Sequence, residues 1–381
     1  MTIRMPVTAL SAALDELIAD GPDAYADRES MVSLRRELAR LEALITRATG
    51  RFDASRDWEP DGAQTAASWL AWKCGLPRTV ARGQVSLARK LRHLPVCEEA
   101  WLDGDITGAH VAIIGGIRRP ETEEALARDE KMLVENARHM RFEGFSRVVG
   151  YWAQRADPNG AEDDDRDRRN QREVHLSESF RGMWFGKITL DPISGTIVAG
   201  ELARREKAMF EADWAEAKAR LGREPTVLDL TRTPAQRRAD ALVEMATRSA
   251  AMPADARRPD PLFSVYVGWE TLYGPLCELA AGTVVSPGTL IPWLDKAYLE
   301  RVVFGLDGRV EVSERARLFK GATRRAIQLR DRQCDEECCD VPAEECDVDH
   351  IVPYSQGGLT TQENGRLGCG FHNRLWYNNG P

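Results

Sequence analysis

The 381-residue sequence contains no run of 18 apolar residues, the length that a membrane-spanning helix needs. An N-terminal signal peptide is also disfavoured, because the first short apolar run is followed at once by Asp15 and Glu16. The apolar residues instead fall on one face of an amphipathic helix, namely Leu10, Leu14, Leu17 and Ile18. We therefore expect a cytoplasmic protein with no membrane partner.

Positive charge is in deficit, with 52 Lys and Arg against 60 Asp and Glu and a net charge of −8. Such a balance is unfavourable for nucleic-acid binding, which depends on neutralising phosphates. The distribution is uneven, however. No Asp or Glu occurs from Gly62 to Cys97, whereas the segment from Asp331 onward has ten acidic residues and three Arg. We infer that this last segment alone would hold DNA weakly.

Residues 31–50 are expected to form a helix that ends at Gly50, because apolar residues recur every three or four positions. These residues are Leu34, Leu38, Leu41 and Ile45. We expect them to face the core and the Arg-rich opposite face to meet solvent.

Two further helices are expected over 66–72 and 80–91, separated by the turn Gly75-Leu76-Pro77. A short Gly-containing turn before a basic helix is the outline of a helix-turn-helix. The arginines that would then contact a DNA phosphate backbone are Arg78, Arg82 and Arg89. The alternative is an αα-hairpin whose arginines meet solvent.

The fold class expected from the whole pattern is α+β, with a mostly helical N-terminal domain over residues 1–156 and an acidic, solvated linker over 157–172. A mixed α/β region follows over 173–321, and a C-terminal domain over 322–381. Further helices are expected over 98–102, 108–115, 120–138, 142–156, 192–221, 234–249, 290–299 and 322–332. Strands are expected over 174–178 and 183–190 as a hairpin, and over 262–266, 282–285, 301–304 and 309–312.

Five of the eight cysteines and two of the six histidines lie in the last fifty residues. Thiol and imidazole groups in closely spaced pairs are typical of a tetrahedral zinc site, here a structural one. The predicted Zn²⁺ ligands are Cys334, Cys339, Cys369 and His372, with Cys338 and Cys346 as alternates. The other interpretation is that these thiols are small buried apolar groups.

Between the two pairs lies a second group made of Asp349, His350, Asn364 and Asn373. Carboxylate and amide oxygens suit a hard cation such as Mg²⁺. Because side chains alternate along a strand, Asp349 and His350 would face opposite sides. For both to act in one site, we expect a twist or bulge in the hairpin at this point.

The segment Asp349-His350-Ile351-Val352-Pro353, the loop glycines Gly357-Gly358, Asn364 and the run Cys369-Gly-Phe-His372-Asn373 resemble the HNH endonuclease family. The resemblance implies a ββα-metal finger, a β-hairpin followed by a helix around one catalytic metal. It implies His350 as general base, Asp349 and Asn373 as ligands of Mg²⁺ or Mn²⁺, and Asn364 as a brace for the loop. Many relatives have His where this chain has Asn373. Arg366 and Arg374 are candidate phosphate-binding residues.

The preceding chain resembles the bacterial domain of unknown function catalogued as 222. The residues that carry this resemblance are W-L-A-W-K-C-G-L-P-R-T-V-A-R, L-A-R-K-L-R-H-L-P, I-T-G-A-H-V-A-I-I, L-D-P-I-S-G and T-R-T-P-A-Q-R-R-A-D-A-L. The resemblance implies an architecture and little mechanism.

Together these patterns predict a metal-dependent HNH endonuclease that hydrolyses DNA. The alternative is a zinc-stabilised DNA- or protein-binding protein that has lost catalysis. A binding module would not need the Asp349-His350 pair, so we prefer the first.

Overall fold

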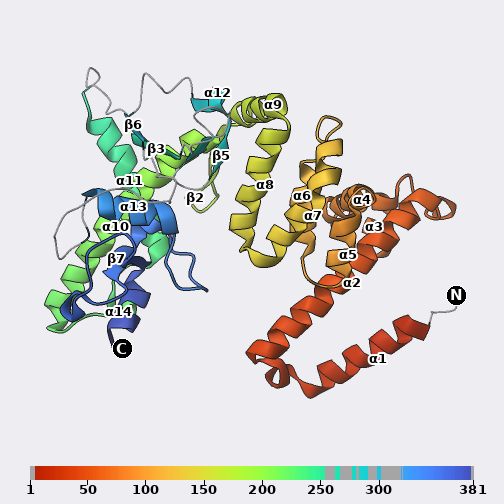
Figure 1. The fold of residues 1–381 in the computed structure, drawn as a ribbon, viewed down its shortest axis with the longest axis horizontal. Helices are drawn as coiled ribbons and strands as arrows, with labels where there is room; N and C mark the ends of the chain where they lie inside the picture. Colours follow the sequence, from red (N-terminus) through yellow and green to blue (C-terminus); the bar gives the residue numbers. More distant parts are fainter. Residues whose placement is uncertain are drawn as a thin grey trace. The chain divides into compact units, whose positions relative to one another are not determined.

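The computed structural model describes residues 5–253, 262–266, 277–279, 283–290, 298–301, 319 and 321–378 (Figure 1). The chain divides into two compact units, Met1–Asp157 and Pro158–Pro381. Helices dominate and the sheets are small, as expected for an α+β protein. Among the helices that the structure describes, none combines the length and apolar character needed to cross a membrane.

The first unit is helical, and every helix predicted in it is present, but the helix predicted to end at Gly50 continues to Ser55. Its helices are α1 (Met5–Asp20), α2 (Arg28–Ser55), α3 (Ala66–Lys73), α4 (Arg78–Leu91), α5 (Pro95–Leu102), α6 (Gly108–Gly116), α7 (Glu123–His139) and α8 (Phe142–Ala156), with short 3-10 turns η1 (Pro22–Tyr25) and η2 (Glu59–Asp61). The core is apolar and includes the fully buried side chains of Trp101, Ile114 and Phe145.

Helix α2 packs through the face opposite to the predicted one. The buried residues are small, among them Ala39, Ala43 and Gly50, and they lie against α4 and α5. A side chain at Gly50 would meet the carbonyl oxygen of Ala88 at 3.2 Å, so the two helices approach closely there. The predicted core residues Leu34 and Ile45 are exposed instead. The prediction for this face was wrong, because the pattern shows that an apolar stripe exists and not what covers it.

The Arg-rich side of α2 is also not simply solvated. Arg36 donates to the carbonyl oxygen of Asp103 at 2.9 Å, and Arg40 to that of Leu102 at 3.1 Å. These are the carbonyls at the end of α5, where a cation also interacts favourably with the helix dipole. The two arginines therefore join α2 to α5.

The second unit begins with a helix where a linker was predicted: α9 spans Pro158–Asn170. Asp165 is buried, and its carboxylate accepts hydrogen bonds from the backbone N–H of Ser286 at 2.6 Å and the hydroxyl of Thr289 at 2.8 Å. These residues lie at the start of the short helix α12 (Pro287–Leu290). The expectation of a solvated linker was wrong, because Asp165 is buried and hydrogen-bonded to a residue about 120 positions later in the sequence.

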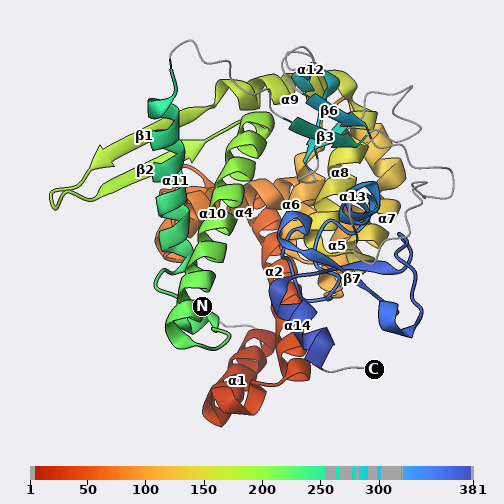
Figure 2. The same cartoon turned by 90° about the vertical axis from the view of Figure 1, so that its left-hand side faces the viewer.

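The predicted hairpin and both long helices of this unit are confirmed. Strands β1 (Glu173–Glu178) and β2 (Trp184–Thr189) pair antiparallel, from Glu173 opposite Thr189 to Glu178 opposite Trp184 (Figure 2). They are followed by α10 (Pro192–Leu221), η3 (Val227–Asp229) and α11 (Pro234–Ala251).

A four-stranded sheet has the order β5-β4-β3-β6. Its strands are β3 (Leu262–Tyr266), β4 (Cys277–Leu279), β5 (Val284–Val285) and β6 (Tyr298–Arg301), with β3 and β6 parallel. The helix predicted over 290–299 is wrong at its end, because Tyr298 and Leu299 belong to β6, and residues 291–297 lie outside the described residues. The last strand therefore starts earlier than the predicted 301–304. The strand predicted over 309–312 lies outside the described residues.

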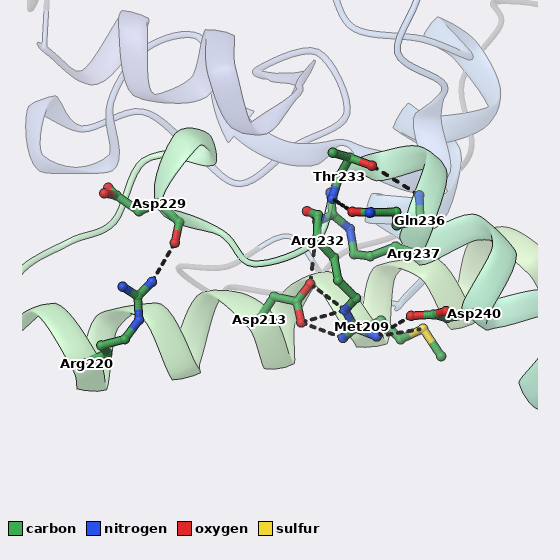
Figure 3. Close-up of polar contacts among 9 residues, drawn as sticks. All are labelled: Met209, Asp213, Arg220, Asp229, Arg232, Thr233, Gln236, Arg237 and Asp240. Atoms are coloured by element: carbon green, nitrogen blue, oxygen red, sulfur yellow. Dashed lines mark hydrogen bonds and ion pairs between the residues drawn. The ribbon is translucent and has the colours of Figure 1, made fainter.

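Helices α10 and α11 are joined by a partly buried ionic network (Figure 3). The carboxylate of Asp213 on α10 accepts hydrogen bonds from Arg232 at 3.2 Å and lies 3.5 Å from the guanidinium of Arg237. Arg232 also donates to Asp240 at 2.9 Å, and the Arg237 guanidinium stacks on Phe210. The segment T-R-T-P-A-Q-R-R-A-D-A-L thus supplies three of the charged groups in a contact between helices.

Candidate functional site

The C-terminal segment contains a two-stranded sheet followed at once by a helix. Its elements are α13 (Gly321–Asp331), η6 (Ala343–Glu345), β7 (Asp347–His350), η7 (Tyr354–Gln356), β8 (Gly365–Gly368) and α14 (Gly370–Asn378). The strands pair antiparallel in four successive one-to-one pairs, from Asp347 opposite Gly368 to His350 opposite Gly365. Leu367, Ile327 and Phe319 form a small core beneath them, together with cysteines.

Four of the predicted metal ligands come together. The thiols of Cys334, Cys339 and Cys369 are buried, and with His372 their ligand atoms all lie within 4.8 Å of one another. The Nδ1 atom of His372 is 3.4 Å from the Cys334 sulfur and 3.3 Å from that of Cys369, and the Cys339 and Cys369 sulfurs are 3.9 Å apart. Bonds of about 2.0–2.3 Å in a tetrahedron place ligands roughly 3.3–3.8 Å apart. The group could therefore bind a metal such as zinc.

The two alternates do not belong to this group. Cys338 is exposed, and the buried thiol of Cys346 is directed at the carbonyl oxygen of Val341, 3.6 Å away. Burial raises the pKa of Cys346 to about 12, which keeps this thiol protonated. For Cys334, burial is outweighed by hydrogen bonds, chiefly from the backbone N–H of Cys369, and the pKa falls to about 7. Cys334 is thus the thiol more readily converted to the thiolate that a metal requires.

His350 ends β7 and faces α13. Its ring lies 4.5 Å from that of Phe319, and its Nε2 atom is 3.0 Å from the hydroxyl of Thr360. A side chain at Gly365, the residue opposite it, would collide with Ile327 and Phe319. Close packing on this side of the hairpin therefore fixes the position of the imidazole.

Asp349 faces the other side of the hairpin. It stands opposite Arg366, whose guanidinium lies 3.7 Å from the centre of the Trp376 ring on α14. Asn373 is one turn earlier on α14 than Trp376, so Asp349, Arg366 and Asn373 share this side. The four regular pairs contain no bulge, so the strands do not carry the bulge that was one of the two expected irregularities. The candidate metal ligands and the candidate base lie on opposite faces.

Asn364 spans the loop between the strands. Its Oδ1 accepts from the backbone N–H of Val352 at 2.8 Å, and its Nδ2 donates to the carbonyl oxygens of Val352 and Leu359 at 3.1 and 2.8 Å. A side chain at Gly358 would lie 1.8 Å from the Val352 oxygen, so only glycine fits this turn. These are the contacts expected of a residue that braces the loop.

The candidate phosphate-binding arginines differ in the contacts that they make with other side chains. Arg89 on α4 forms a two-pronged ion pair with Asp53 of α2 at 2.8 and 2.9 Å, which gives it a structural role that the sequence analysis missed. Arg78 and Arg82 are exposed on the same helix. In the C-terminal segment, Arg366 stacks on an indole, and the exposed Arg374 lies 5.6 Å from the ring of Trp214.

Arginines of α13 also hold the hairpin in place. Arg330 donates to the carbonyl oxygens of Gln362 at 2.6 Å and Gly365 at 2.7 Å, and Arg324 donates to that of Cys346 at 3.0 Å. The sequence predicts a helix over 322–332 but not these contacts. Its basic character was the available signal, but which carbonyls it reaches depends on the fold.

Comparison with known proteins places most of the chain in one family. The model of the family described as "Domain of unknown function (DUF222)" matches residues 26–331. Uncharacterized protein Rv3776 of Mycobacterium tuberculosis (strain ATCC 25618 / H37Rv) is 26% identical, over 91% of this chain and 71% of that protein. Uncharacterized protein MT1160 of M. tuberculosis (strain CDC 1551 / Oshkosh) is 26% identical, over 93% and 89%. No solved structure matches the chain. Because the family match spans most of its length and stops at the end of α13, the protein belongs to the DUF222 family and carries a C-terminal hairpin and helix beyond the matched residues.

Proposed function

We propose that the protein is a metal-dependent HNH-type endonuclease that hydrolyses DNA phosphodiester bonds. The observation that carries this proposal is the C-terminal arrangement, in which a hairpin with Asp349 and His350 at its strand end leads directly into a helix. The loop brace at Asn364 and the Cys₃His group at the helix start lend further support. The residues that form these features all lie in the C-terminal segment, outside the first unit.

In this proposal, His350 removes a proton from the attacking water. The Thr360 hydroxyl beside Nε2 and the ring of Phe319 hold the imidazole in one orientation. Asp349 and Asn373 would hold Mg²⁺ or Mn²⁺, which when bound would polarise the scissile phosphate. Arg374 is the more accessible of the two C-terminal arginines for binding phosphate, since Arg366 is stacked on Trp376.

The Cys₃His group is proposed to hold one structural Zn²⁺. The donor set fits, because three thiols and one imidazole fill the four positions of a closed tetrahedral site. The group joins a turn before β7 to the start of α14, so its bonds would link the two ends of the segment. The small core around Leu367 offers little else to hold these ends together.

One observation favours the alternative of a zinc-stabilised DNA- or protein-binding protein without catalysis. Asp349 and His350 lie on opposite faces of a regular strand pair, and the imidazole is packed against Phe319. A metal held by Asp349 would then be on the far side of the hairpin from the base. Catalysis requires the end of β7 to rearrange when DNA binds.

Cleavage of supercoiled plasmid separates the two proposals. We expect nicking or cutting only with Mg²⁺ or Mn²⁺, and a loss of about 10²–10⁴-fold for His350→Ala, the usual contribution of a general base. His139→Ala is the matched control, because this histidine is exposed on α7. Cleavage by the His350 variant at the wild-type rate would exclude the endonuclease. DNA binding without cleavage by the wild-type protein would favour the alternative.

A further inference from the structure

Helix α1 carries an apolar stripe that is largely exposed in the part of the chain that the structure describes. Val7, Leu10, Leu14 and Leu17 follow one another at steps of three, four and three residues. Val7 is 57% exposed and Leu14 is 46% exposed, although both lie in a regular helix. Alternating steps of three and four are the 3.5-residue repeat of a coiled-coil seam.

The first half of α2 has the same repeat. Its members are Met31, Leu34, Leu38, Leu41 and Ile45. Leu38 is 45% exposed, because the core of the unit packs against the small residues on the other side of the helix. Adjacent large apolar side chains left in solvent mark an interaction surface and are not usual on a monomer.

The charges beside the α2 stripe indicate what covers it. Arg35 and Glu42 occupy equivalent flanking positions one heptad apart, on either side of Leu38. Both side chains are exposed, and neither makes an ion pair in the part of the chain that the structure describes. Flanking positions of this kind form ion pairs between helices. A partner helix must therefore offer an acid opposite Arg35 and a base opposite Glu42.

Helix α1 of the same chain does not meet this requirement. Over Met5–Asp20 it contains acids but no Lys or Arg, so it has no cation for Glu42. A second α2 running antiparallel does meet it, because Arg35 of each copy then faces Glu42 of the other. A two-fold axis near Leu38 relates the two pairs, as in an isologous dimer.

We infer that two copies of this chain associate through antiparallel α2 helices, with the α1 stripes adding to the same apolar interface. The seam buries Leu34, Leu38, Leu41 and Ile45 of both copies, and the Arg35–Glu42 pairs set the direction of the helices. The inference does not depend on the proposed nuclease activity.

Sedimentation of the full chain without DNA tests this inference. We expect a mass of twice 42.6 kDa that falls towards the monomer on dilution. Leu38→Glu should raise the dimer dissociation constant at least about a hundredfold, because it places two like charges in the seam. Leu228→Glu is the control, since Leu228 is 94% exposed outside this surface and should leave the mass unchanged. A wild-type chain that stays monomeric at high micromolar concentration would overturn the inference.

Charge reversal tests the antiparallel arrangement. Arg35→Glu and Glu42→Arg should each weaken the dimer about tenfold, since each turns two attractive pairs into repulsive ones. The double variant should regain most of the wild-type affinity. Circular dichroism should show unchanged helix content in all three. If the double variant is as weak as the single ones, the two α2 helices do not pair in this way.

Discussion

The N-terminal helical unit and the C-terminal hairpin-helix segment are stabilised by different means. The core of the first unit is made of large apolar side chains such as Trp101, Ile114 and Phe145. The core of the C-terminal segment is small, and among the residues that the structure describes four of its eight buried members are cysteines. Apolar burial grows with the size of a domain, and a segment this short rarely folds on it alone. A metal bound by the Cys₃His group would therefore stabilise the C-terminal segment, whereas the first unit does not depend on one.

The largest expected effect is loss of the proposed zinc site. Cys369→Ser should release the metal and unfold the C-terminal segment, because metal binding in small domains contributes on the order of 10 kcal/mol to folding. Metal analysis and limited proteolysis measure the two outcomes. Cys74→Ser, at an exposed thiol in the first unit, is the matched control. A segment that stays protease-resistant in a zinc-free wild-type protein would contradict the proposal.

A core substitution should destabilise the first unit independently of any metal. Phe145→Ala removes a fully buried ring and should destabilise this unit by about 3–5 kcal/mol. The loss should be the same with and without a chelator, as followed by hydrogen exchange of the first-unit helices. A chelator-dependent loss there would show that the two regions are coupled.

The contact between α9 and α12 should depend on pH. Burial opposes ionisation of Asp165, but hydrogen bonds from Ser286 and Thr289 outweigh it and hold its pKa below the usual value. Its contribution is therefore complete above the unfolded-state pKa near 4 and is lost as the pH falls through the lower folded-state value.

Asp165→Asn should cost about 1.5–3 kcal/mol at pH 7, the range for hydrogen bonds to a charged group, and the cost should shrink in acid. Chemical denaturation at pH 7 and at low pH measures this difference. Asp163→Asn is the control, because Asp163 lies on the same helix and is exposed. An equal cost at both pH values would mean that the ionised carboxylate is not what stabilises the contact.

The smallest expected effect concerns DNA. If the basic helix α4 binds phosphates, replacing Arg78 and Arg82 by Ala should weaken the salt dependence of DNA binding. The slope of log K against log salt concentration should become shallower by about 0.9 for each phosphate that is no longer neutralised. Arg89→Ala should instead lower stability, since it leaves the partly buried carboxylate of Asp53 without this partner. An unchanged salt slope in the double variant would show that Arg78 and Arg82 are solvated and do not contact DNA phosphates.

Local patterns determined much of this structure. The helices of the first unit, the hairpin of β1 and β2, and α10 follow from residue periodicity, from Gly and Pro at their ends and from caps such as Asp191. The candidate metal-ligand set Cys334, Cys339, Cys369 and His372 was also predicted from spacing, although the fold was needed to exclude the alternates Cys338 and Cys346. For each helix, strand and ligand pair, the information lies within a few neighbouring residues.

Tertiary structure decided what each face contacts. The stripe of α2 was recognisable, but the small residues opposite it allow α4 and α5 to approach more closely, and so the large residues remain outside. Arg89 became structural because the fold brings Asp53 to it from 36 residues away. Asp165 is buried because Ser286 and Thr289 lie beside it and donate hydrogen bonds to its carboxylate. Periodicity tells which residues share a surface, whereas the partner of that surface depends on contacts between segments distant in the sequence.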